Sequence, residues 1–214
     1  MFASACKLIE PCLCQIFGVK PDDEIVVMGA GCLLAPNLVI SARHLFTDAV
    51  KAGGELRISN RAGTYSADLV WKDPVLDVAV FRTTASLSKT DQTTPTSFPK
   101  LATVLPEQGM LVGYMATLRR EGGPVRNNKY FSSGFVSHLS HLNSPAVNYV
   151  LGAGFMEGGF SGGPVFQSDG SLIGVLVCAF QIASQGLDTI TFCAFPEFAS
   201  VAQIRNKIAA ACQS

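Results

Sequence analysis

A serine surrounded by glycines is the feature of this sequence best suited to covalent chemistry. Ser161 lies in residues 158–164, which read Gly-Gly-Phe-Ser-Gly-Gly-Pro. Glycines let a backbone bend sharply, so that the N–H groups of Gly159 and Ser161 could point at one oxyanion. A phosphate-binding loop is disfavoured because no G-x-x-x-x-G-K-[ST] pattern is present. The remaining alternative is a glycine-rich turn with an incidental serine.

A nucleophilic serine needs a base and a group that orients the base. His44 follows an apolar strand and is the candidate base. We interpret the two other histidines, His138 and His141, as surface or structural residues. Asp77 begins another apolar strand, where a buried carboxylate needs a partner, and His44 would provide one. Asp73 is the alternative acid, but it precedes a proline, which is typical of a turn.

The elements that must position these residues are short β-strands. Segments rich in Val, Ile, Phe and Tyr recur between Gly, Pro, Asn and Asp, which is typical of strands. The spacing favours a sandwich or barrel over a parallel α/β sheet. The predicted strands are 24–28, 33–41, 55–59, 67–71, 78–83, 110–116, 131–139, 148–151, 164–166, 172–179 and 189–194.

Two further segments divide the chain. Residues 86–100 are rich in Ser and Thr and contain two prolines, which is typical of a connecting segment. We therefore expect one unit over 1–85 and another over 101–195. The tail 196–214 contains the one convincing helix, because apolar residues recur there at helical spacing after a proline. These apolar residues are Phe198, Val201, Ile204 and Ile208.

Composition excludes several classes of protein. The chain has 214 residues, and 16 basic residues balance 16 acidic ones. A nucleic-acid partner is disfavoured, because it would require a clustered basic surface. No apolar run approaches the roughly 20 residues that span a bilayer. Cys12 and Cys14 lack a second pair of ligands for zinc, so we expect no metal and no cofactor.

The seven cysteines form no regular disulfide framework. We expect reduced, mostly buried thiols and hence an intracellular, cytoplasmic setting. Lys7, Glu10 and Pro11 interrupt any signal-peptide core, so we do not expect a cleaved secretory signal. Delivery into a host cell and a viral origin remain alternatives.

Three segments together resemble the signature blocks of trypsin/chymotrypsin-like serine proteases. They are GAGCLLAPNLVISARHLF at 29–46, DPVLDVAVF at 73–81 and GGFSGGPVF at 158–166. The similarity is greatest to the HtrA/Deg-like and compact bacterial or viral branch, without a PDZ domain, and it extends over roughly residues 13–210. The order His, Asp, Ser is also that of chymotrypsin-like enzymes.

The resemblance implies an all-β fold of two six-stranded antiparallel β-barrels with a C-terminal α-helix. The N-terminal barrel would carry His44 and Asp77, and the C-terminal barrel would carry Ser161. It further implies that these three residues form a catalytic triad and that Gly159 and Ser161 donate to the oxyanion. Phe160 replaces the aspartate that digestive enzymes have before the nucleophile, so activation by a new N-terminus is not expected.

The resemblance also places a primary specificity pocket. It would be lined by Phe155 and Met156 and by the strand residues Val177, Cys178 and Ala179. None of these residues is acidic, so we expect cleavage after apolar residues and not after Arg or Lys.

The sequence therefore predicts a serine endopeptidase that acts on a protein or peptide through an acyl-enzyme. One alternative is a catalytically silent trypsin-like fold that binds proteins, although such folds usually lose a triad member. The other is a viral or effector protease with few targets. The sequence indicates no membrane span and no oligomeric state.

Overall fold

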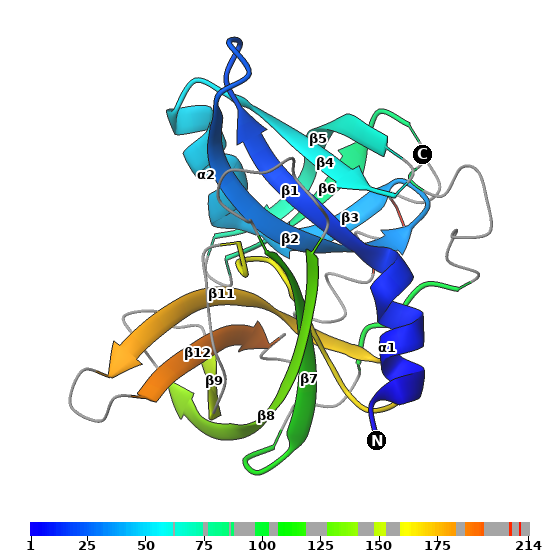
Figure 1. The fold of residues 1–214 in the computed structure, drawn as a ribbon, viewed down its shortest axis with the longest axis vertical. Coiled ribbons are helices and arrows are strands. Elements are labelled where there is room, and N and C mark those ends of the chain that lie inside the picture. The colour runs from blue at the N-terminus through cyan, green and yellow to red at the C-terminus, as the bar shows by residue number, and fades with distance from the viewer. Residues whose placement is uncertain are drawn as a thin grey trace.

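The computed structural model describes residues 1–61, 63–74, 77–85, 87, 97–102, 107–118, 128–140, 148–152, 159–182, 187–194, 206 and 210. Within this part of the chain, the strands form two closed barrels of six strands each. The barrels lie one above the other in Figure 1. This arrangement confirms the predicted all-β fold of two six-stranded antiparallel barrels.

The first barrel has the strand order β1-β2-β3-β6-β5-β4. Its interior is a continuous cluster of buried aliphatic and aromatic side chains, which includes Ile16, Ile40 and Phe81. Strand β3 is buried along its whole length, whereas β5 presents every second residue to solvent. The strands are β1 (Leu13–Val19), β2 (Ile25–Ala35), β3 (Leu38–Ala42), β4 (Glu55–Asn60), β5 (Gly63–Asp73) and β6 (Val78–Thr83).

The second barrel has the strand order β10-β11-β12-β9-β8-β7. A separate apolar cluster fills it, and Tyr114, Phe160 and Val165 are among its buried members. Its strands are β7 (Leu111–Leu118), β8 (Asn128–Ser140), β9 (Asn148–Gly152), β10 (Pro164–Phe166), β11 (Leu172–Ile182) and β12 (Leu187–Ala194). The predicted connecting segment 86–100 lies largely outside the described residues.

Two described helices were not predicted from the sequence. Helix α2 (Arg43–Lys51) follows β3 directly and packs on β1, β2 and β4. Helix α1 (Ala3–Ile9) precedes the first barrel but covers the second (Figure 1). It does so because Phe2 and Ile9 pack in one buried cluster with Met115 of β7 and Phe166 of β10.

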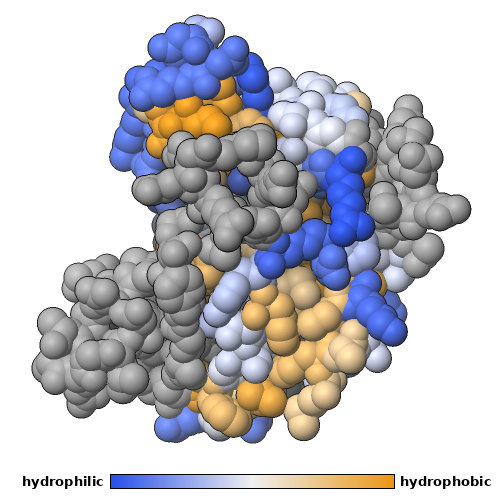
Figure 2. Space-filling model, viewed as in Figure 1, coloured by the Kyte–Doolittle hydropathy of each residue, from blue (hydrophilic) through white to orange (hydrophobic). Residues whose placement is uncertain are grey.

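The segment after α1 links both barrels through charge. Glu10 begins the short 3-10 helix η1 (Glu10–Cys12). Its carboxylate pairs with Lys129 of β8 at 3.1 Å and with Arg61, in the turn between β4 and β5, at 3.6 Å. Near α1, Figure 2 shows apolar surface over the second barrel. Phe131 and Phe135 of β8 are among the exposed large apolar side chains of the described residues.

The predicted strands agree with the structure to different degrees. The bounds of β6 and β10 match the prediction residue for residue. The single strand predicted over 33–41 is wrong, because β2 ends at Ala35 and β3 begins at Leu38. Pro36 and Asn37 form the turn between them, as the restricted backbone of proline favours. Strand β1 was not predicted.

The predicted C-terminal helix lies outside the described residues, apart from Asn206 and Ala210, and it stays a prediction. Among the described helices, none is both long and apolar enough to cross a membrane.

Candidate active site

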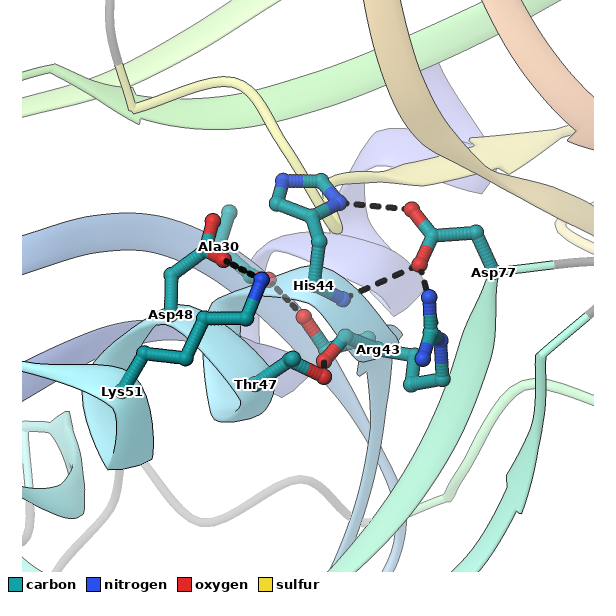
Figure 3. Close-up of polar contacts among 8 residues, drawn as sticks. Ala30, Arg43, His44, Thr47, Asp48, Lys51 and Asp77 are labelled. Carbon is teal, nitrogen blue, oxygen red and sulfur yellow. Dashed lines mark hydrogen bonds and ion pairs between the residues drawn. The ribbon is translucent and has the colours of Figure 1, made fainter.

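The ring of His44 and the carboxylate of Asp77 form a short hydrogen bond. His44 lies in the first turn of α2, and Asp77 lies in the turn that precedes β6. The distance from His44 Nδ1 to Asp77 Oδ2 is 2.6 Å (Figure 3). Because an ionised carboxylate can only accept, Nδ1 carries the proton and Nε2 is left as the basic nitrogen.

Asp77 also caps the helix that carries His44. Its carbonyl oxygen accepts the N–H of Arg43 at 2.8 Å, and its Oδ1 accepts the N–H of His44 at 3.0 Å. These N–H groups would otherwise lack partners, because Ala42 at the N-cap has no side chain that can accept. Asp77 makes both bonds from a left-handed backbone conformation with φ of 55°, which aspartate tolerates better than most residues.

The side chain of Arg43 contacts the same carboxylate. Its Nε lies 3.3 Å from Asp77 Oδ1, and the Arg43 and Asp77 side chains are 27% and 25% exposed. We predicted no role for Arg43 from the sequence, because its partner lies 34 residues away. A cation in the first turn of a helix is unfavourable unless an acid compensates it, and that local conflict is the signal that could have identified it.

Of the two candidate acids, Asp77 is the one whose carboxylate contacts the His44 ring. Asp73 is the last residue of β5 and is paired in register with Val78.

Ser161 lies in a tight turn between β9 and β10. The N–H of Gly163 donates to the carbonyl of Phe160 at 2.9 Å, and Gly162 has φ of 81°. A positive φ at the third position is typical of a type II turn and favours glycine there. A side chain on Gly162 would also collide with Ser41 Oγ and the carbonyl oxygen of Ala30. Only glycine therefore fits beside the serine.

The first barrel holds this turn of the second barrel. The carbonyl of Ser161 accepts the N–H of Ala30 in β2 at 2.7 Å. Ser41 in β3 donates its hydroxyl to the carbonyl of Ala30 at 2.6 Å. Thr117 of β7 donates to the carbonyl of Gly29, in β2, at 3.3 Å. The serine turn and the strand that leads to His44 are thus attached to the same part of β2.

The residues before Ser161 are anchored in the second barrel. Phe160 is only 1% exposed, and its ring stacks on Tyr130 with centroids 5.2 Å apart. Gly159 has φ of 107°, and an added Cβ would lie 2.8 Å from the carbonyl oxygen of Thr117. Among the described contacts, no hydrogen bond joins Ser161 Oγ to His44. Catalytic hydrogen bonds of this kind are often long before substrate binds.

The predicted specificity residues are described only in part. Phe155 and Met156 lie outside the described residues. Val177, Cys178 and Ala179 lie on β11, where the register shifts between Leu176 and Cys178. The half-buried side chain of Val177 packs against the apolar cluster that fills the first barrel and extends to Leu172 and Val175 of β11. Of Cys178 and Ala179, only the backbone is described.

Four cysteine side chains lie in the part of the chain that the structure describes. Cys6, Cys12, Cys14 and Cys32 are free thiols, and the last three are buried in the first barrel. Burial raises the pKa of Cys12 to about 12 and raises the pKa of Cys14 and Cys32 as well, so these thiols stay protonated and unreactive. Among the described residues, no group of His, Cys, Asp and Glu could hold a metal ion.

Comparison with known proteins gives one family and a set of similar folds. The model of the trypsin-like peptidase domain matches residues 29–175, which include His44, Asp77 and Ser161. No curated protein matches the sequence.

The solved structures with a similar fold include two bacterial proteases. A serine endoprotease from Yersinia pestis is 18% identical with a TM-score of 0.69, and the match covers 98% of this chain and 67% of that one. The active form of the Rv3671c protease from M. tuberculosis is 20% identical with a TM-score of 0.67, over 92% and 82% of the two chains. Its inactive serine-to-alanine mutant is 19% identical with a TM-score of 0.65, over 98% and 92%.

Proposed function

The chain belongs to the trypsin-like peptidase family and is a serine endopeptidase, and from this premise we propose that His44, Asp77 and Ser161 are its catalytic triad. The observation that carries the proposal is the bond of 2.6 Å from His44 Nδ1 to Asp77 Oδ2. It leaves the other ring nitrogen, Nε2, free to act as a base. The serine turn is attached to β2, the neighbour of the strand from which His44 follows.

In the proposed reaction, Ser161 Oγ attacks the carbonyl carbon of the scissile peptide bond while His44 Nε2 takes the hydroxyl proton. The C–N bond then breaks, and the imidazolium gives this proton to the leaving amine. A water molecule then attacks the acyl carbon while His44 takes a proton from it, the ester bond to Ser161 Oγ breaks, and His44 returns this proton to Ser161 Oγ. Asp77 orients the ring and stabilises its positive charge throughout.

The backbone N–H groups of Gly159 and Ser161 would donate to the oxyanion of the tetrahedral intermediate. The glycine conformations around Ser161 support this role, because they hold a turn that a residue with a Cβ could not adopt. Specificity for an apolar residue before the cut rests on the sequence, which has Phe155 and Met156 where a basic side chain would need an acid.

A fluorophosphonate probe tests the proposal directly, because it modifies only an activated serine. We expect one labelled site, Ser161, in the wild-type protein. Ser161→Ala and His44→Ala should both abolish labelling. Ser133→Ala is the matched control, because Ser133 is an exposed serine on β8, and it should be labelled as the wild type is. Labelling that survives in Ser161→Ala would refute the assignment, and no labelling of a folded wild-type protein would favour the silent binding module.

A further inference from the structure

The carboxylate of Asp77 is shared between two side chains that approach different oxygens. His44 Nδ1 contacts Oδ2, whereas Arg43 Nε and the His44 N–H both contact Oδ1 (Figure 3). A carboxylate can rotate about its last single bond, and Asp77 lies in a turn and not in the hydrogen-bonded ladder of a strand. Two donors on Oδ1 fix its plane, so that Oδ2 faces the imidazole.

The contact with Arg43 is also partly shielded from water, since only about a quarter of each side chain is exposed. Ion pairs on an open surface contribute little because solvent and salt screen them, and partial burial strengthens them. Arg43 and Asp77 are further joined by the backbone bond from Arg43 N–H to the Asp77 carbonyl. Arg43 therefore binds both the backbone and the side chain of the residue that orients His44.

We propose that Arg43 is a positioning residue that fixes the rotation of the Asp77 carboxylate and, through it, the orientation of the His44 ring. The inference rests on the proposed triad. It adds to that triad a fourth side chain, which touches neither the substrate nor the reacting atoms. Removing Arg43 should slow the chemical step and leave substrate binding nearly unchanged, because the substrate does not contact it.

The kinetic test compares Arg43→Ala, Arg43→Lys and Arg57→Ala on one peptide substrate. Arg43→Ala should lower kcat about tenfold with KM within about twofold of the wild type. Arg43→Lys should recover most of the loss, because an ammonium can still donate to Oδ1, although without the planar guanidinium. Arg57→Ala is the matched control, since Arg57 pairs with Glu55 on β4, and it should leave both constants unchanged. Unchanged kcat in Arg43→Ala, or a loss confined to KM, would overturn the proposal.

A spectroscopic test does not depend on activity. The proton between His44 Nδ1 and Asp77 Oδ2 should give a low-field 1H NMR resonance. We expect this resonance to be lost or broadened in Arg43→Ala and restored in Arg43→Lys. The remaining resonances of both variants should be dispersed as in the folded wild type. A resonance unchanged in Arg43→Ala would refute the positioning role even if Ser161→Ala proves inactive. Loss of the resonance in Arg43→Ala while Ser161→Ala remains active would instead refute the triad. It would still support the conclusion that Arg43 positions Asp77 and the His44 ring.

Discussion

The two halves of the proposed active site are held by different kinds of interaction. On the first barrel, Asp77 binds the N-terminus of α2 through polar contacts of 2.6–3.3 Å to Arg43 and His44. On the second barrel, the Ser161 hydroxyl has no hydrogen-bond partner among the described residues. Its turn is shaped instead by backbone bonds and by the space that glycine leaves. The base half should therefore respond to charge, and the nucleophile half to volume.

The largest effect on kcat is expected when the negative charge of the Asp77 carboxylate is removed from the first half. Asp77→Asn keeps the size of the side chain and tolerates the left-handed conformation. Its amide, however, has one accepting oxygen and one donating NH2 group, so it cannot accept both from His44 Nδ1 and from the N-terminus of α2. We expect kcat to fall about 10⁴-fold, as when a protease triad loses its acid in this way. The measurement is kcat beside the melting temperature. Asp73→Asn is the control, and greater inactivation by it than by Asp77→Asn would assign the acid to Asp73.

In the second half, volume should matter more than charge. Gly162→Ala adds one methyl group where Ser41 Oγ and the Ala30 carbonyl already lie. We expect a loss of about 2–4 kcal/mol in the free energy of unfolding, with kcat reduced at least about 100-fold.

The control for this variant is Gly109→Ala. Gly109 has a nearly equal φ, 84° against 81°, but an added Cβ there would meet nothing within 4 Å. Its cost should be only the conformational one, about 1–2 kcal/mol, with activity retained. Equal losses in the two variants, measured by urea unfolding, would mean that the collision with the first barrel is unimportant.

The substrate preference tests the same half of the site at its pocket. With no acid in the predicted pocket, a basic side chain would be buried without a partner. Peptides that differ only in the residue before the cut should be cleaved about 10–100-fold faster after Leu or Val than after Arg, as judged by kcat/KM. Faster cleavage after Arg would show that an acid reaches the pocket.

The smallest effect at neutral pH is expected from the described buried thiols, which belong to neither half. The ordinary pKa of a cysteine is 9.0, and burial raises that of Cys12 to about 12 in the fold. Both states hold the proton below pH 9, so the thiol costs nothing there. Between pH 9 and pH 12 only the unfolded chain releases it, and stability should fall by up to about 1.4 kcal/mol per pH unit.

The check is the difference between the wild type and Cys12→Ala in melting temperature across this range. The variant should lose stability less steeply above pH 9. Parallel curves would show that Cys12 ionises as easily in the fold as in the unfolded chain.

The sequence predicted the strands that are apolar and bounded by turn residues, which is why β6 and β10 matched. It missed β1 because Gln15 and Gly18 interrupt both the alternating and the continuous apolar pattern. It missed α2 because that helix begins without a capping side chain, its cap being supplied by Asp77 from another part of the chain. His44 and Asp77 could be predicted from the sequence, because each lies at one end of an apolar strand within a recognisable motif. Arg43 was not predicted, because the residue that its proposed role requires lies 34 residues away.

The position of α1 also has a consequence for the order in which the molecule assembles. During synthesis Phe2 and Ile9 emerge before Met115 and Phe166, their partners in the second barrel. The first barrel can close in the meantime, because its own strands are already complete. The apolar side of the N-terminal segment can therefore be buried completely only after Phe166 has been synthesised. This contact has a very long sequence separation. We expect its docking to be a late step of folding.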